Sequence, residues 1–450
     1  MVVFLMTTKP SENKALNDAI ENHLVKNVED DWFRLDNAAT LFSLVTSSRI
    51  TCLFRVSFSL KEPINIAKLQ KVLDKIIDRF PYYKVELRKG LFWYYWETNP
   101  ENPKVILDTK YPCQKMPITK RGIFPFRVRA YKNRIAVEFH HSITDGAGAM
   151  TFLKTLVIEY LRKDDQKFTE VKEVFNINEK PHYEEYEDAF KRNYQKKIPN
   201  PKSPSRAFQL PYKLEPKGVY HITTGIISID EILKKTRELN VTLTEYLIAV
   251  YLDALQEILF DLPEKEQKRL LKPIRLQVPV NLRRMYPSKT MRNFSLYVTP
   301  SIDPRLGRHT FNEILQQVYH YMRVEVSDKF INQWIARNVR GELNPLLRIT
   351  PLLLKKTFGK LIYNNLGEYL YSGVITNLGL VNFPEEIKDE IIELQFVPAQ
   401  SPVTKVGCAV ASLHDKLYIT FGRTIKEAKV ERMFFTRLVK EGIKVRIETN

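Results

Sequence analysis

The residues with the clearest chemical potential are two adjacent histidines followed by an aspartate and a glycine, in the run 140–146 (HHSITDG). A neutral imidazole accepts a proton near pH 7, and a nearby carboxylate can orient that ring or pair with a cation. This combination is typical of a site that removes a proton from a nucleophile. The candidate catalytic residues are therefore His141 and Asp145, with His140 and Gly146 supporting them.

The flanking sequence predicts a strand, a turn and the start of a helix. Apolar and polar residues alternate over 126–131 and again over 135–139, which indicates a hairpin. Apolar residues then recur at helical spacing over 150–160, and Asp145 occupies the N-cap position. If the alternation continues past the second strand, His141 lies on its more apolar face. We therefore expect His141 to be the more buried histidine.

Other interpretations of the run are weaker. Asp145 could be only a helix cap beside hydrogen-bonded core histidines, but the complete seven-residue pattern outweighs that interpretation. Adjacent strand residues point to opposite faces and no Cys or Glu cluster completes a ligand set, so no metal site is predicted. A dinucleotide-binding loop at 146–148 is excluded because Thr151 stands where a third glycine or alanine is required.

The run resembles the HHxxxDG signature of the chloramphenicol acetyltransferase superfamily, which includes condensation domains, polyketide-associated acyltransferases, plant BAHD enzymes and bacterial alcohol O-acetyltransferases. The similarity is greatest to the alcohol acetyltransferase-like and polyketide-associated branches. Arg292 stands where the family has a glycine, and the DFGWG motif of the plant enzymes is absent. Further segments resemble the family in order along nearly the whole chain: 32–39 (WFRLDNAA), 79–81 (RFP), 278–283 (VPVNLR), 292–294 (RNF) and 376–379 (TNLG).

The resemblance implies an α/β (α+β layered) fold with two chloramphenicol acetyltransferase-like half-domains. Each half-domain would be a mixed sheet with flanking helices, and an active-site tunnel would lie at their interface. The implied reaction is transfer of an acyl group from an acyl-CoA thioester to a small-molecule alcohol or amine, with His141 as general base. Acyl-CoA is then a co-substrate, and no permanently bound cofactor is expected.

Two alternatives stay open. The first is a free-standing condensation-like enzyme that takes its acyl group from an acyl carrier protein. The second is a catalytically silent relative that serves as a binding or scaffold module, although the complete HHxxxDG run argues against it.

The supporting residues have expected roles. Asp145 could orient the imidazole or pair with a cation; the resemblance favours an ion pair with Arg283, which matches the family's arginine position. Gly146 would keep space beside the ring, or be an ordinary first-turn glycine. Thr376 and Asn377 are candidates for stabilising the oxyanion or lining the tunnel, although such a run is also common at a strand end and turn.

The chain divides around a charged, proline-rich bridge. We expect an N-terminal half-domain at 1–185 that carries HHxxxDG, a crossover linker at 186–218, and a C-terminal half-domain at 219–450. A capping box at 242–245 predicts a long helix, and 404–413 with 416–421 predict a hairpin.

Composition indicates a large cytoplasmic protein. Three widely spaced cysteines suggest reduced thiols, and the apolar opening at 1–6 lacks the features of a signal peptide. No membrane-spanning run is found. The net charge of +18 suits an anionic partner such as coenzyme A or an acidic carrier protein; no nucleic-acid-binding module is recognised, so no nucleic acid is expected.

One apolar, basic stretch at 345–362 allows three interpretations: packing in the core, lining a lipophilic channel, or contact with a membrane surface. Pro351 would break a continuous interfacial helix, so we expect the stretch to pack in the core. A lipophilic acceptor is compatible with it.

Overall fold

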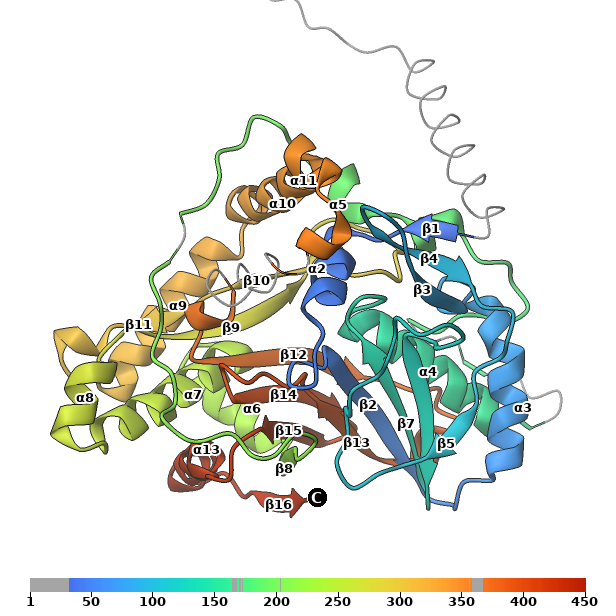
Figure 1. Cartoon of the computed structure of the whole chain (residues 1–450). Helices are drawn as coiled ribbons and strands as arrows, with labels where there is room; N and C mark the ends of the chain where they lie inside the picture. Colours follow the sequence, from blue (N-terminus) through green and yellow to red (C-terminus); the bar gives the residue numbers. More distant parts are fainter. Residues whose placement is uncertain are drawn as a thin grey trace, which may run out of the picture.

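A computed structural model describes residues 32–163, 168–169, 171, 173–202, 204–355, 357 and 367–450. Within these residues three β-sheets form the framework, and helices cover them (Figure 1). The apolar opening at 1–6 and the end of the apolar stretch, at 356 and 358–362, lie outside the described residues.

The sheet that carries the histidines has the strand order β13-β2-β7-β6-β5. Strand β5 is parallel to β6 and the other neighbours are antiparallel, so the sheet is mixed. The predicted hairpin is confirmed: β6 and β7 pair from Phe126 opposite Phe139 to Tyr131 opposite Arg134. The strands are β2 (Leu53–Leu60), β5 (Val105–Leu107), β6 (Phe126–Tyr131), β7 (Arg134–His140) and β13 (Ile391–Val397).

Two helices cover this sheet, and a small second sheet lies beside it. Helices α3 (Ile66–Ile76) and α4 (Gly146–Leu161) pack against each other, and α4 contacts β2 and β7. Both helices bury apolar side chains, so they close one face of the sheet over a common core. The small antiparallel sheet has the order β1-β4-β3, with β1 (Trp32–Arg34), β3 (Val85–Lys89) and β4 (Tyr94–Thr98).

The largest sheet follows the crossover and has the order β10-β9-β12-β14-β15-β8-β16, with β11 also paired to β9. Strand β12 is parallel to both β9 and β14, so this sheet is mixed as well. The hairpin predicted around 414–415 is present as β14 and β15. The strands are β8 (His221–Ser228), β9 (Ile274–Asn281), β10 (Ser295–Val298), β11 (Ser301–Ile302), β12 (Gly373–Val381), β14 (Val406–Leu413), β15 (Lys416–Arg423) and β16 (Arg446–Thr449).

Helix α7 (Leu243–Phe260) is the central helix of this region. The predicted capping box is present, because Thr242 and Glu245 bond reciprocally at its start. Its apolar residues join a second core with the sheet and with neighbouring helices. The other helices are α2 (Asn37–Val45), α5 (Ala189–Arg192), α6 (Ile229–Glu238), α8 (Glu264–Leu270), α9 (Phe311–Glu325), α10 (Asp328–Leu343), α11 (Pro345–Ile349) and α13 (Lys429–Lys440), with 3-10 turns at Ile77–Arg79, Tyr183–Tyr186, Leu282–Arg284, Pro304–Leu306, Glu368–Leu370 and Lys388–Glu390.

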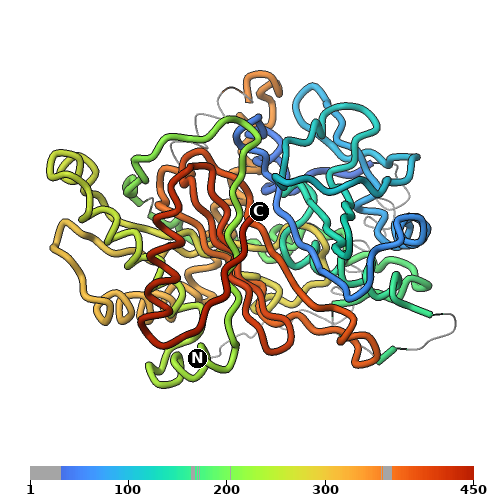
Figure 2. The backbone as a smooth tube through the Cα atoms, turned by 90° about the horizontal axis from the view of Figure 1, so that it is seen from below, coloured from blue at the N-terminus to red at the C-terminus, as the bar shows by residue number. Residues whose placement is uncertain are grey.

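One strand from the C-terminal part of the sequence belongs to the first sheet and so connects the two regions. Strand β13 comes from the part of the sequence predicted to be the C-terminal half-domain, but it pairs antiparallel with β2 of the first sheet. Figure 2 shows the segment that includes β13 extending from the red and orange C-terminal part into the blue and teal N-terminal part. The segment between α5 and β8 runs along the outside of the molecule from one region to the other (Figure 1). The domain boundaries at 185 and 218 stay predictions.

The described part of the apolar stretch contradicts one expectation. Leu346, Leu347, Ile349, Leu353 and Leu354 are exposed, so packing in the core is wrong for most of the apolar side chains at 345–355. Short elements broken at Pro351 do not provide a long apolar face, and only Leu352 and Lys355 turn inward. Across the described ranges, no helix is both long enough and apolar enough to cross a bilayer.

Candidate active site

The HHxxxDG run lies at the junction of β7 and α4, as the sequence predicts. Strand β7 ends at His140, residues 141–143 form a turn, and α4 begins at Gly146. Asp145 is the N-cap residue, and its Oδ1 accepts a hydrogen bond from the Gly148 N–H at 3.2 Å. The strand and helix therefore fix both ends of the run.

His140 is completely buried and is held on both ring nitrogens. Its Nε2 lies 2.8 Å from Thr46 Oγ1, whose own hydroxyl donates to the Phe42 carbonyl. Its Nδ1 accepts from the Ser142 N–H at 3.2 Å and lies 2.7 Å from Ser142 Oγ. These partners suit a neutral ring with its proton on Nε2. Burial, with the adjacent His141, lowers the pKa of His140 to about 3.

His141 lies between two aromatic rings. Phe42 of α2 stacks on it with ring centroids 5.0 Å apart, and Phe54 of β2 lies 4.4 Å from it. Burial lowers the pKa of His141 to about 4, against the opposing effects of the Asp145 charge and the Thr144 backbone. The ring is therefore neutral at pH 7.

The expected order of burial of the two histidines is wrong. His140 is fully buried, whereas His141 keeps part of its surface exposed. The alternation of faces stops because β7 ends at His140 and the chain turns at His141. The face that carries His140 is also covered, since its neighbours Ala136 and Glu138 are buried.

Asp145 and Arg283 form the ion pair that the resemblance implies. Asp145 Oδ2 accepts from Arg283 Nη1 at 2.8 Å and from the Phe294 N–H at 2.9 Å. Although burial alone raises the pKa of Asp145, the Arg283 charge and these hydrogen bonds outweigh it and hold the pKa below its usual value. The carboxylate is thus ionised and forms an ion pair with Arg283.

Residues 290–294 close around this pair. Arg283 donates to the carbonyls of Thr290 and Arg292, with Nη2 at 2.9 and 2.7 Å respectively. Asn293 Nδ2 donates to the His141 carbonyl at 2.8 Å. The His141 backbone and the Asp145 side chain are therefore both held by residues far away in the sequence.

Arg292, the departure from the family's glycine, connects this loop to the N-terminal motif. Its guanidinium donates to the carbonyls of Arg34 and Tyr186 at 2.9 and 3.3 Å, and its Nε lies 3.4 Å from Asp36 Oδ2. Asp36 caps α2 by accepting from the Ala39 N–H at 2.7 Å. Because α2 carries Phe42 and ends at its C-cap residue Thr46, the N-terminal motif positions the side chains that hold both histidines.

Gly146, which ends the run, and Gly148, in the first turn of α4, have different surroundings. A side chain at Gly146 would place its Cβ 2.9 Å from Leu378 Cδ2 and 3.7 Å from Phe396 Cζ, so this glycine leaves room for neighbouring apolar residues. At Gly148 a Cβ would lie 2.2 Å from Thr144 Oγ1 and 2.8 Å from the Met291 carbonyl. Of these two, Gly148 is therefore the glycine that the packing requires more strongly, and the sequence analysis did not single it out.

A second set of contacts missed from the sequence supports the turn. The Tyr83 hydroxyl donates to Thr144 Oγ1 at 2.8 Å, and Thr144 Oγ1 donates to the Met291 carbonyl at 2.7 Å. All three residues are buried. In the sequence, Tyr83 lies two residues after the RFP segment at 79–81, and this position was the signal that could have pointed to it.

The two residues proposed from the TNLG segment differ in what surrounds them. Asn377 donates to Thr244 Oγ1 at 3.1 Å and accepts from the Gly379 N–H at 2.8 Å, so both ends of its amide are engaged. Thr376 lies on the same side of β12 as Leu378, which reaches Gly146. A role for either residue at the histidines stays a prediction.

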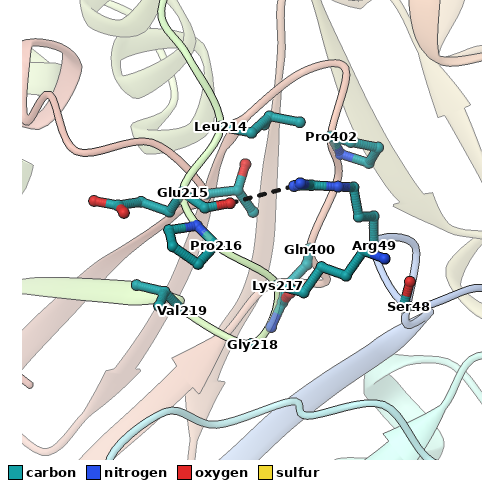
Figure 3. A pocket seen from close by; sticks show the side chains of 11 residues that line it. Ser48, Arg49, Leu214, Glu215, Pro216, Lys217, Gly218, Val219, Gln400 and Pro402 are labelled. Carbon is teal, nitrogen blue, oxygen red and sulfur yellow. Dashed lines mark hydrogen bonds between the residues drawn. The ribbon is translucent and has the colours of Figure 1, made fainter.

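Two pockets lie where the crossover meets both regions. One, of about 160 Å³, is lined by Ser48, Thr51, Gln114, Lys115, Lys217, Gly218 and Gln400. Figure 3 shows the other, where Arg49 Nη1 donates to the Glu215 carbonyl at 3.3 Å. Thr51 precedes Cys52, whose carbonyl accepts from the His141 N–H at 2.8 Å. His141 itself lines neither pocket.

In the part of the chain with described coordinates, no three His, Cys, Asp or Glu residues group as metal ligands. The cysteines Cys52, Cys113 and Cys408 are free and buried.

Comparison with solved structures decides the fold. The chain resembles trichothecene 15-O-acetyltransferase from Fusarium sporotrichioides, with a TM-score of 0.58 and 12% identity, over 91% of this chain and 94% of that one. It also resembles TRI101 of F. graminearum complexed with coenzyme A and deoxynivalenol, with a TM-score of 0.60 and 8% identity over 92% and 100%. A third is the condensation domain of the Monacolin K polyketide synthase MokA, with a TM-score of 0.53 and 12% identity over 91% and 96%.

The chain shares the fold of these two acetyltransferases and of this condensation domain, which is the chloramphenicol acetyltransferase-like fold expected from the sequence. The expected α/β fold with two sheet-rich halves and flanking helices is thereby confirmed, and the tunnel at their interface stays a prediction. No family model matches the sequence, and no curated protein matches it.

Proposed function

We propose that this protein is an acyltransferase that moves an acyl group from an acyl-CoA thioester to an alcohol or amine, with His141 as general base. The observation that carries the proposal is a neutral, partly exposed imidazole held between Phe42 and Phe54, beside a carboxylate that is turned to Arg283. The ring is neutral at pH 7, so one of its two nitrogens carries no proton and can accept one, and Asp145 does not have to serve as its hydrogen-bond partner.

The proposed reaction uses the imidazole twice. The acceptor's oxygen or nitrogen attacks the thioester carbonyl while His141 accepts its proton, and a tetrahedral oxyanion forms. When that intermediate collapses, the carbon–sulfur bond breaks and the imidazolium returns the proton to the departing thiolate. Thr376 is the candidate to stabilise the oxyanion, and Asn377, whose amide is engaged, shapes the turn beside it.

Release of free thiol from a panel of acyl-CoAs, with alcohols and amines as acceptors, tests this function. We expect His141→Ala to lower turnover by about 10² to 10⁴ while the urea midpoint stays close to that of the wild type. The exposed His320 on α9 provides a matched control, and His320→Ala should keep full activity. Absence of thiol release with every donor, unchanged by His141→Ala, would favour the catalytically silent module.

We further infer that the donor's phosphates approach the pocket at the crossover. Lys115 and Lys217 are exposed at that pocket, and Thr51 contributes a buried hydroxyl without a hydrogen-bond partner. Anionic phosphates suit such a rim. Exchange of both lysines for alanine should raise KM for acyl-CoA and leave KM for the corresponding acyl-pantetheine, which lacks the phosphates, unchanged. Lys265→Ala on α8 is the control for loss of a distant exposed charge.

A second candidate is a free-standing condensation-like enzyme with a carrier-bound donor. The net charge of +18 suits an acidic carrier protein, and one structural neighbour is a polyketide synthase condensation domain. The test is the ratio of kcat/KM for an acyl group on a carrier protein to kcat/KM for the same group on CoA. A ratio near one does not separate the two candidates. A ratio well above one in favour of the carrier supports the second candidate.

A further inference from the structure

Two segments far apart in sequence form one exposed apolar surface. The tip of the β3–β4 hairpin contributes Leu91, which is 72% exposed, and Phe92. Residues 346–354 contribute Leu346, Ile349 and Leu353, which are 72%, 67% and 71% exposed. We name this surface, with Leu347 and Leu354, the apical surface; α11 lies at the top of the molecule in Figure 1.

Direct contacts join the two segments. The Leu352 N–H donates to the Leu91 carbonyl at 2.9 Å. Lys355 Nζ donates to the Phe92 carbonyl at 2.9 Å and lies 3.1 Å from the centre of the Trp93 ring. The exposed leucines are therefore held as one surface across both regions of the fold, and the surface does not arise from one loose loop.

The exposed charged side chains within the two segments that form the apical surface are basic. Lys89 and Arg348 are exposed beside the apolar side chains, whereas Arg88 pairs with Glu86 and Glu97, and Lys355 is buried. Clustered leucines with Phe and Trp, flanked by basic residues, are the composition of surfaces that lie at a bilayer interface among anionic headgroups. A second copy of this chain would bring two basic surfaces together, which is unfavourable.

We propose that the apical surface docks this protein onto an anionic lipid bilayer. The apolar side chains enter the boundary between headgroups and acyl chains, and the flanking cations meet the negative surface charge. The proposal does not depend on acyl transfer, because it concerns binding alone. Failure of the activity assay and failure of lipid binding are therefore separate results.

Co-sedimentation of the full chain with vesicles tests the proposal. We expect binding to vesicles that contain phosphatidylglycerol, weaker binding to pure phosphatidylcholine, and weakening by salt. The triple variant Leu91→Ser, Leu346→Ser, Leu353→Ser should lower the bound fraction relative to free protein by at least about tenfold. Leu306→Ser is the matched control, because Leu306 is 84% exposed in the turn between β11 and α9, outside the apical surface, and its loss should not change binding.

Leu346→Trp gives an independent measurement that needs no loss of binding. Its fluorescence should shift to shorter wavelength when anionic vesicles are added, because the indole leaves water. The proposal is overturned if the wild type does not bind anionic vesicles, or if the triple variant binds as the wild type does. It is also overturned if sedimentation velocity reveals a dimer that the triple variant abolishes while neither protein binds vesicles.

Discussion

Removal of the Asp145 carboxylate should cost this protein a large part of its stability. The carboxylate is buried and accepts hydrogen bonds from Arg283, from the Phe294 N–H and from the Gly148 N–H. Asp145→Ala leaves the mostly buried Arg283 guanidinium without its counter-ion and two N–H groups without acceptors. Loss of one partner of a buried pair costs about 3–5 kcal/mol, out of total stabilities of about 5–15 kcal/mol.

Asp145→Asn removes the negative charge of the side chain and keeps its shape, so it measures the contribution of the charge. An amide retains one acceptor oxygen but turns an NH₂ group toward a donor, so we expect a smaller loss of about 1.5–3 kcal/mol. Because the folded pKa of Asp145 lies below its usual value, the stabilisation is present above about pH 4 and is lost as the pH falls through the folded value.

Urea unfolding at pH 7 measures these differences, and the chain contains a matched control. Asp303 also caps a helical turn and pairs with an arginine, Arg305 at 2.6 Å, but this pair is exposed. Asp303→Ala should therefore cost clearly less than Asp145→Ala, because water screens the Asp303–Arg305 pair. If Asp145→Ala and Asp303→Ala cost the same within about 1 kcal/mol, burial does not decide the strength of the Asp145 pair and the reasoning is refuted.

Three further predictions concern the surroundings of the histidines. Gly148→Ala should destabilise the fold by about 1–3 kcal/mol in urea unfolding, because its Cβ would overlap Thr144, whereas Gly341→Ala, with open space around it in α10, should stabilise by about 0.4–1 kcal/mol. Phe42→Ala should raise the pKa of His141 from about 4 toward 6.5 in an NMR titration, because water then reaches the ring; an unchanged pKa would contradict the role given to stacking. His140 has a folded pKa of about 3, so the unfolded chain binds its proton first. Its contribution to stability is complete above about pH 6.5 and should fall by about 3 kcal/mol by pH 4.5; His140→Asn should reduce the change in urea midpoint over that range without abolishing it, because His141 also has a lowered pKa.

Local chemistry in the sequence was sufficient to predict the strand, turn and helix around the histidines. The alternation at 126–139 and the Asp145 cap depend on neighbouring residues, and both are present. The pairing with Arg283 followed from resemblance, because nothing local to Asp145 points to a residue 138 positions away.

The errors have physical causes as well. Alternation of faces holds only while the strand continues, so it failed at His141, one residue beyond the end of β7. The pairing of β13 with β2 joins residues more than 300 positions apart and leaves no local pattern. The exposure of 346–354 could not be predicted from hydropathy, because apolar residues that face a partner or a bilayer have the same composition as a core.

The site depends on residues from both sides of the crossover, and this links its chemistry to the stability of the whole chain. The strand that ends at His140 and the cap at Asp145 come from before residue 185, whereas Arg283, Asn293 and the Phe294 N–H come from after residue 218. Neither group can satisfy the buried Asp145 carboxylate alone. Substitutions at 283–294 should therefore change stability and turnover together, while changes at Phe42 or Phe54 act on the pKa of His141 through its contact with water.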